Sequence, residues 1–204
     1  GRCPVSVVVT LGNTNNTATF TTVDTLTSGS GNDTIAFTGA LSNASVDLGG
    51  GNDTLTLSDL GNTVTVANTA TITGGNGDDS ITLGTALTNS IQVDLGAGNN
   101  MLALADGGNT DTVSNVDTLI GGTGADVITL ATAIANGSVD LGGGADKLTL
   151  ANGGNNLTIV DFQTLTGGTG ADTVTLGALV NDVSVDLGAG NDTLNLGNFS
   201  NTLT

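Results

Sequence analysis

The sequence predicts an all-β fold: a right-handed parallel β-solenoid with about eight coils of 20–26 residues each. Three observations predict it. A glycine-rich turn recurs along the chain, short alternating apolar strands flank each copy, and no segment carries a sustained helical period. The 204 residues suffice for one continuous repeat array with a core of its own. With four Phe and no Trp or Tyr, that core must be thin and stacked.

The turn has the form G-x-G-x-D/N and sets the period of the chain. Its eight copies occupy residues 29–33, 49–53, 75–79, 96–100, 122–126, 142–146, 168–172 and 188–192. Their last residues are spaced 20, 26, 21, 26, 20, 26 and 20 apart, so the full unit is 46 or 47 residues. With one turn per coil, the glycine turns should line up along one edge of the solenoid. The looser loops at 84–89 and 177–182 should then lie along the opposite edge.

Strands with a period of two residues lie on both sides of each turn. Segments such as Thr54–Leu57 and Val127–Leu130 place Leu, Ile or Val on one face and Thr, Ala or Asn on the other. Segments such as Val93–Leu95 and Thr164–Thr166 lead into the next turn with the same alternation. Coils of this kind stack about 4.8 Å apart, so eight of them would form a rod of roughly 40 Å.

The two ends of the chain depart from this pattern. Residues 1–22 lack the turn motif, and their alternation predicts a degenerate N-terminal coil or cap before a repeat array at 23–204. Thr204 lies partway through a unit, which favours a segment of a longer array or a subunit that stacks end to end. Gly1 stands where a start methionine would be, and no signal peptide or 18-residue apolar run is present, so we expect a processed or excised segment. The single Cys3 cannot form an intramolecular disulfide; an inert thiol is favoured over a bond to another molecule.

Charge and composition exclude several classes of function. The net charge is −17 and the only basic residues are Arg2 and Lys147, which excludes a binder of nucleic acid or of anionic membranes. The chain has no His, Glu or Tyr, and a repeating rod offers no unique cleft, so we expect no enzyme activity. Every acidic residue is Asp, the short side chain that tight turns select.

The turns are suited to a hard cation. Glycine accepts positive φ and leaves backbone carbonyls pointing into the turn. Ca²⁺ takes six to eight oxygen ligands from carboxylates and carbonyls. Carboxylates stacked about 4.8 Å apart repel by roughly 0.9 kcal/mol per pair in water, and by about 3.5 kcal/mol at an effective dielectric constant of about 20. Bridging cations would remove this repulsion, so metal binding and folding should be coupled.

At this point the residues resemble a known family. The stretches 73–82, T-G-G-N-G-D-D-S-I-T, and 166–175, T-G-G-T-G-A-D-T-V-T, resemble the RTX (repeats-in-toxin) nonapeptide G-G-x-G-x-D-x-U-x over residues 23–204. The resemblance implies a calcium-filled parallel β-roll that is exported from a bacterium to the cell surface or beyond. It implies carboxylate or amide ligands at Asp33, Asp53, Asp79, Asn100, Asp126, Asp146, Asp172 and Asp192. It implies carbonyl ligands at Gly29, Gly31, Gly49, Gly51, Gly75, Gly77, Gly96, Gly98, Gly122, Gly124, Gly142, Gly144, Gly168, Gly170, Gly188 and Gly190.

Departures from the family pattern shape the expected sites. The family's closest-packed form repeats its turn every nine residues with ions on both edges, whereas the interval here is 20 to 26, so we expect several Ca²⁺ ions along one edge only. Asn100 replaces a carboxylate and should weaken its site. A second series, Asp47, Asp94, Asp140 and Asp186, could complete the coordination or bind further calcium; solvated surface carboxylates are favoured over that role.

Three functions remain open. The favoured one is a calcium-stabilised structural segment of a secreted bacterial surface protein of the S-layer, adhesin or filament type, with possible end-to-end homo-oligomers. The second is an ice-binding RTX module, in which outward threonines form a flat ladder interrupted by Ala36, Ala103 and Asn195. This ladder would comprise Thr56, Thr82, Thr129, Thr149 and Thr175. The third is the calcium-dependent secretion or folding module of a larger exported enzyme.

Overall fold

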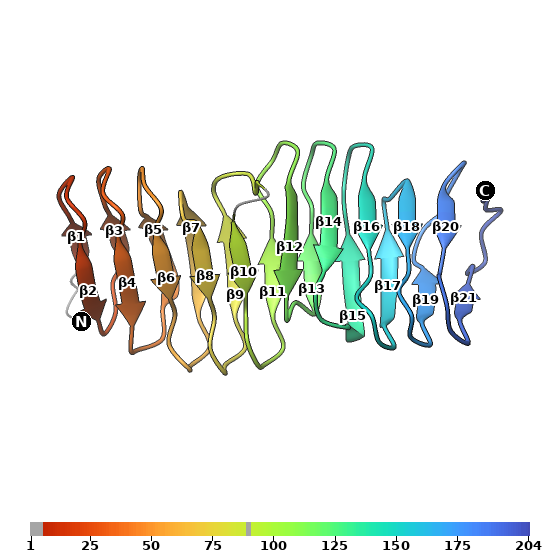
Figure 1. Cartoon of the computed structure of the whole chain (residues 1–204), viewed down its shortest axis with the longest axis horizontal. Helices are drawn as coiled ribbons and strands as arrows, with labels where there is room; N and C mark the ends of the chain where they lie inside the picture. Colours follow the sequence, from red (N-terminus) through yellow and green to blue (C-terminus); the bar gives the residue numbers. More distant parts are fainter. Residues whose placement is uncertain (1–5, 89–90) are drawn as a thin grey trace, which may run out of the picture.

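The computed structural model describes residues 6–88 and 91–204 and forms a parallel β-solenoid of about nine turns (Figure 1). Its strands alternate along the chain between two parallel sheets, A and B. Sheet A has eleven strands: β1 (Val8–Thr10), β3 (Thr25–Thr27), β5 (Ser42–Asp47), β7 (Thr63–Ala67), β9 (Ser80–Leu83), β11 (Met101–Ala103), β13 (Thr118–Ile120), β15 (Ala135–Asp140), β17 (Asn156–Val160), β19 (Thr173–Leu176) and β21 (Thr193–Asn195). Sheet B has ten: β2 (Thr17–Phe20), β4 (Thr34–Phe37), β6 (Thr54–Thr56), β8 (Thr71–Thr73), β10 (Gln92–Asp94), β12 (Thr110–Ser114), β14 (Val127–Leu130), β16 (Lys147–Thr149), β18 (Thr164–Thr166) and β20 (Ser184–Asp186).

The register confirms the parallel solenoid but corrects the length of a coil. Successive strands of sheet A pair residues that are 17, 20 or 21 positions apart, as in Val9 with Leu26, Leu26 with Val46, and Ile81 with Leu102. Coils of 20–26 residues were therefore a wrong prediction. A unit of 46 or 47 residues covers about two and a half coils, so each repeat begins on the opposite side of the rod from the one before.

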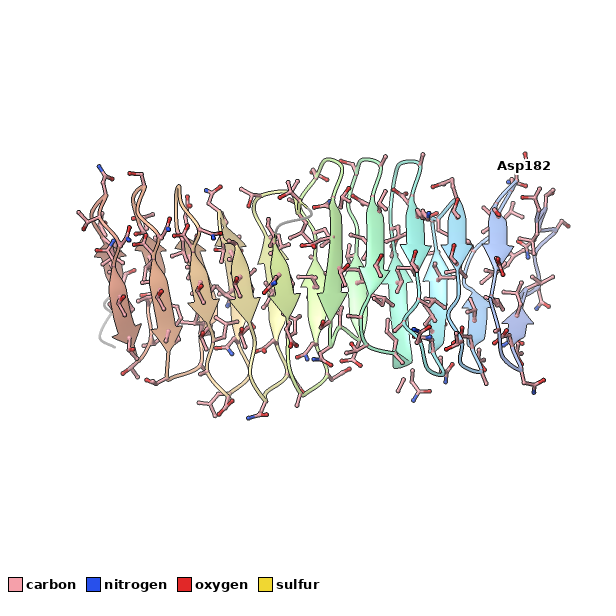
Figure 2. All side chains as sticks on the ribbon, in the orientation of Figure 1. Asp182 is labelled. Atoms are coloured by element: carbon pink, nitrogen blue, oxygen red, sulfur yellow. The ribbon has the colours of Figure 1, made fainter. Side chains whose placement is uncertain are left out.

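The glycine turns consequently lie on both edges of the rod, and the expectation of a single edge was wrong. We call edge 1 the side where the chain passes from sheet A to sheet B, and edge 2 the side where it returns; they lie at the top and bottom of Figure 1. Edge 1 carries the turns 29–33, 49–53, 122–126 and 142–146, and edge 2 carries 75–79, 96–100, 168–172 and 188–192. The looser loops after β9 and β19 are both on edge 1, where Asp182 projects in the second of them (Figure 2).

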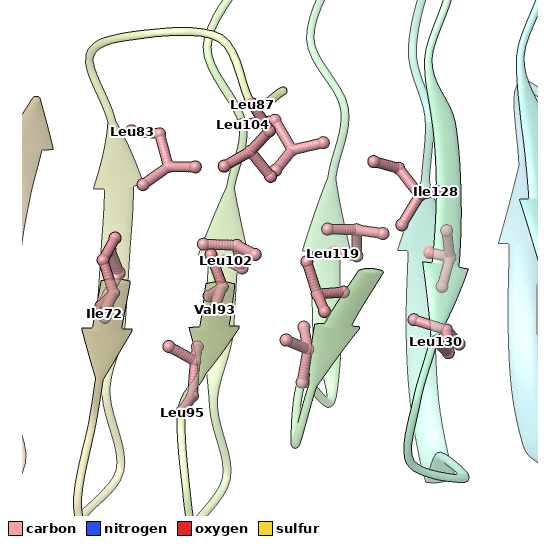
Figure 3. Packing of buried hydrophobic residues seen from close by; sticks show 14 of the residues in the cluster. Ile72, Leu83, Leu87, Val93, Leu95, Leu102, Leu104, Leu119, Ile128 and Leu130 are labelled. Atoms are coloured by element: carbon pink, nitrogen blue, oxygen red, sulfur yellow. The ribbon is translucent and has the colours of Figure 1, made fainter. Parts of the chain in front are cut away.

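The core is a thin layer of aliphatic side chains between the two sheets. Val93 and Leu95 of one sheet and Leu102 of the other point into this layer, and each is at most 2% exposed (Figure 3). Aromatic contacts are few, as the composition predicts; the rings of Phe20 and Phe37 lie 6.0 Å apart. Stacking of equivalent Leu, Ile and Val from coil to coil therefore supplies most of the hydrophobic stabilisation.

Residues before the first glycine turn join the same two sheets. Strand β1 pairs in parallel with β3, and β2 with β4, so residues 6–22 continue the solenoid. Cys3 lies outside the described residues, and the hypotheses about its thiol stay untested. Among the residues that the structure describes, no helix is long and apolar enough to span a membrane.

Candidate metal sites along the two edges

Each glycine turn ends in a polar side chain that ties two coils together. The Oδ1 atom of this residue accepts a hydrogen bond from the backbone N–H of the equivalent residue one coil earlier. Asp53 binds Asp33 in this way at 2.7 Å. Asp146 binds Asp126 at 2.8 Å and Asp192 binds Asp172 at 2.9 Å. Because parallel coils stack in register, these contacts form a side-chain ladder along each edge.

The ladder begins with asparagines that the sequence analysis missed. Asp79 Oδ1 accepts hydrogen bonds from both the backbone N–H and the Nδ2 of Asn62, at 2.9 and 2.8 Å. Asn62 Nδ2 also donates to the carbonyls of Ser58 and Leu60 in its own turn. A signal was available in the sequence, because in each repeat an Asn precedes the first turn Asp by 17 residues. The pairs are Asn16 with Asp33, Asn62 with Asp79, Asn109 with Asp126, and Asn155 with Asp172.

The second carboxylate oxygen of most turn aspartates has no partner. Oδ2 is buried and without a hydrogen bond in Asp53, Asp79, Asp126, Asp146 and Asp172. All five side chains are at most 2% exposed. A buried carboxylate oxygen with no donor is costly unless a cation compensates it. Burial raises the pKa of Asp53, Asp79 and Asp146 above the ordinary value, as expected for carboxylates that lack a compensating charge.

Backbone carbonyls converge on these unpartnered oxygens. A Cβ added to Gly74 would lie 2.5 Å from Asp79 Oδ2 and 2.3 Å from the carbonyl oxygen of Leu95, in the next coil. At the corresponding Gly121 the distances are 2.8 Å to Asp126 Oδ2 and 2.4 Å to the Leu141 carbonyl. Several oxygens and no donor thus surround one small space between successive turns. This is the donor set of a hard cation such as Ca²⁺.

Asn100 shows what satisfies the same space without a cation. Its Oδ1 keeps the ladder contact, accepting the N–H of Asp79 at 3.0 Å. Its Nδ2 donates to the carbonyls of Leu95, Gly96 and Asn115, at 3.4, 3.3 and 3.1 Å. The amide therefore supplies the positive hydrogens that these carbonyls require, and a cation would have to displace it.

Asp33 and Asp192 have different surroundings from the other turn aspartates. Burial acts to raise the pKa of Asp33, but hydrogen bonds from the Ser28 hydroxyl and from the backbone and side chain of Asn16 outweigh it and lower the pKa overall. Ser28 stands where the RTX pattern has its first glycine. Asp192 is only partly buried and keeps its ladder contact with Asp172.

Glycine is required where adjacent turns touch. Gly96 and Gly142 both have φ of +74°, and a Cβ on either would lie 2.0 Å from the carbonyl oxygen of the equivalent glycine one coil earlier. No other residue fits such a contact. The alternate glycines predicted from the sequence therefore permit the close approach that brings the carbonyls together.

The second aspartate series caps the turns. Asp47 Oδ1 accepts the N–H of Gly49 at 3.0 Å. Asp94, Asp140 and Asp186 make the same contact with the glycine two residues later. All four remain at least partly exposed, so they combine the expected solvated position with a role in the turn.

Another series, treated in the sequence as surface, also belongs to the edge ladder. Asp24 Oδ2 accepts the N–H of Val7, and Asp117 Oδ2 accepts the N–H of Asn100. Gln163 accepts the N–H of Asp146 through Oε1. Among residues 6–88 and 91–204, no three His, Cys, Asp or Glu side chains gather closely enough to hold a metal ion by themselves. Any site at a glycine turn must therefore be completed by backbone carbonyls.

Comparison with known proteins agrees with this geometry. The model of the RTX calcium-binding nonapeptide repeat matches residues 21–36, 71–85, 111–130, 163–178 and 182–203. These segments include three of the five unpartnered aspartates, Asp79, Asp126 and Asp172. No curated protein and no solved structure matches the chain.

Proposed function

Because the chain carries RTX calcium-binding nonapeptide repeats in a parallel β-solenoid, we propose that calcium ions between its turns rigidify a non-catalytic structural segment of a secreted bacterial surface protein. RTX repeats are typical of secreted bacterial proteins. The observation that carries the proposal is the series of buried, unpartnered Oδ2 atoms that recurs on both edges. An S-layer, an adhesin and an extracellular filament all require such a stiff, repetitive element.

The proposed ligands follow from the turns. The carboxylates are Asp33, Asp53, Asp79, Asp126, Asp146, Asp172 and Asp192, and the glycine-turn carbonyls complete each site. When bound, calcium supplies positive charge that removes the repulsion between stacked carboxylates and carbonyls. The protein's own contribution is the ladder of Oδ1 contacts, which holds each carboxylate so that Oδ2 faces the neighbouring turn. Asn100 is proposed to replace an ion with its amide.

A segment of this kind can extend by adding strands. Strands β1 and β21 are the outer strands of sheet A in the part of the chain that the structure describes, and each pairs with one neighbour there. A further copy stacked on either strand would continue the ladder. We therefore propose end-to-end homo-oligomers as the mode of assembly, with no nucleic-acid or membrane partner.

Chelation of calcium tests the proposed function. In EGTA the carboxylates lose their counter-charge, so we expect the β-sheet circular dichroism and any assembly to be lost, and to return when Ca²⁺ is added in excess. Mg²⁺ at the same concentration is the control, because its small octahedral shell does not suit a site made mainly of carbonyls. A β-sheet spectrum that is unchanged in EGTA would contradict the proposal.

A second candidate function rests on a column of threonines on the outer face of sheet B. The five threonines predicted to form one ladder do not, because Thr82 and Thr175 lie on sheet A. The register instead aligns two runs of four threonines in one column of sheet B, separated by the strand that contains Gln92. The runs are Thr17, Thr34, Thr54, Thr71 and Thr112, Thr129, Thr149, Thr166.

This column favours binding to a regular surface such as ice, since it presents hydroxyl and methyl groups at one repeat distance. Thermal hysteresis measured with Ca²⁺ present decides between the candidates. If the column binds ice, Thr54→Lys and Thr129→Lys abolish hysteresis, whereas Thr82→Lys on sheet A leaves it intact. No hysteresis in the unaltered chain leaves the structural role alone.

A further inference from the structure

The three tight turns that follow the second glycine turn of a repeat differ in one residue. In the first repeat Asn68 Nδ2 donates to Asp47 Oδ1 at 2.7 Å, across adjacent coils. In the second, Asn115 donates to Asp94 at 2.6 Å. In the third repeat Asp161 occupies the place of the asparagine, opposite Asp140. A hydrogen-bonded pair is thus replaced by two carboxylates.

The backbone around this replacement is unchanged. Asp140 pairs with Val160 in the sheet as Asp47 pairs with Ala67, so Asp161 follows the paired residue just as Asn68 does. Residue 161 has φ of +50°, against +54° for Asn68 and +58° for Asn115. The Asp161 side chain therefore leaves the backbone at the point from which the asparagines reach their partners.

A third carboxylate faces the same place. Asp146 is 1% exposed, and its Oδ2 has no hydrogen-bond partner. The equivalent atom in the second repeat, Asn100 Nδ2, lies 3.1 Å from the carbonyl oxygen of residue 115, the counterpart of residue 161. By this equivalence Asp146 Oδ2 is aimed at the backbone of Asp161.

The tight turns also leave room for a ligand. Three residues, 68–70, join β7 to β8, whereas six, 48–53, join β5 to β6, so the tight turn is set back from its neighbour. A recess of about 380 Å³ results beside the second glycine turn of the first repeat, lined by Gly49–Asn52 and Asn68 among others. The second repeat has a recess of about 90 Å³ at the same place, lined by Gly96, Gly98 and Asn115 among others.

We propose that Asp140, Asp146 and Asp161 bind an additional Ca²⁺ ion at this position of the third repeat, a site that the first two repeats lack. Asp140 keeps one oxygen on the N–H of Gly142, at 3.0 Å, and offers the other. The three carboxylates are not gathered to coordination distance among the described residues, so closing the site requires rotation of the exposed Asp161 side chain. The choice of cation rests on the proposed function.

The experiment compares the unaltered chain with two reciprocal variants. Asp161→Asn restores the Asp–Asn pair of the other repeats, and Asn68→Asp places the same three carboxylates in the first repeat, beside Asp47 and Asp53. Bound calcium is counted by equilibrium dialysis, and stability is measured by urea unfolding with Ca²⁺ and with EGTA. We expect Asp161→Asn to bind one ion fewer and to unfold at higher urea in EGTA. Asn68→Asp should bind one ion more and unfold at lower urea in EGTA.

The outcomes separate this site from the turn sites. A chain that binds no calcium at all overturns both proposals. If the chain binds calcium and Asp161→Asn binds the same number of ions, the additional site is refuted and the turn sites stand. If Asp161→Asn changes only how stability in EGTA depends on pH, Asp140 and Asp161 share a proton instead, and the additional site is again refuted.

Discussion

Two turns at the same place in successive repeats, 96–100 and 142–146, end in different residues and solve the same problem differently. Asn100 closes its turn with amide hydrogens that reach three carbonyls. Asp146 makes the same Oδ1 ladder contact, but its Oδ2 has no partner. The glycines of both turns have the same backbone conformation. The comparison teaches that glycine builds the oxygen-lined space, whereas the last residue decides whether an amide or a cation fills it.

The largest expected effect tests whether the two turns really share this backbone. Gly96→Ala and Gly142→Ala each place a methyl group 2.0 Å from a carbonyl oxygen at positive φ, so each should destabilise by about 2 kcal/mol or more, with and without calcium. The measurement is urea unfolding in Ca²⁺ and in EGTA. Gly143→Ala is the control, because a Cβ there meets nothing within 4 Å. A strong effect at Gly143, or none at Gly96, would show that the turns differ in more than their last residue.

Exchanging the two terminal residues should exchange their behaviour. Asn100→Asp sets a carboxylate against three carbonyls and should destabilise by about 1–3 kcal/mol in EGTA, while adding one calcium ion when the metal is present. Asp146→Asn should stabilise by about 1 kcal/mol in EGTA and bind one ion fewer. Unfolding in EGTA and isothermal titration with Ca²⁺ provide the two readouts. Equal ion counts in both variants and the unaltered chain would break the comparison.

Acidification should have opposite effects with and without calcium. Burial raises the pKa of Asp53, Asp79 and Asp146 above 3.8 in the folded, metal-free chain. Protonation of these groups therefore stabilises the fold; this contribution is fully present below pH 3.8 and is lost as the pH rises through the raised pKa values. Lowering the pH from about 7 to about 5 should raise the Tm in EGTA modestly, and lower it in Ca²⁺, because protons displace the ion. A Tm that moves the same way in both buffers would contradict this account.

The strands and turns could be read from the sequence, but their placement on two edges could not. Alternation of apolar residues predicted strands such as Thr173–Leu176 to within a residue, because period-two patterning directly reflects which side chains face the core. The intervals of 20 and 26 residues were ambiguous. An interval of 26 can be one long coil or one and a half short ones, and only strand pairing distinguishes them.

The site was predictable to the same depth. The turn aspartates were found because their spacing repeats with the glycines. Asn62 and its counterparts were missed because no glycine motif marks them, although their 17-residue distance to the next Asp was visible. Asp111 remains without an explanation: it points into the core where Val64 and Leu157 stand in other repeats, and its Oδ2 has no partner.

A repeat of two and a half coils has a mechanical consequence. Ions drawn to one side only would shorten that side with every repeat, and the molecule would bow as a bimetallic strip does. Here each contraction is opposed by an equal one across the width of the next repeat. Such an alternation keeps a long array straight however many units are added, and it spreads a pulling load over both margins.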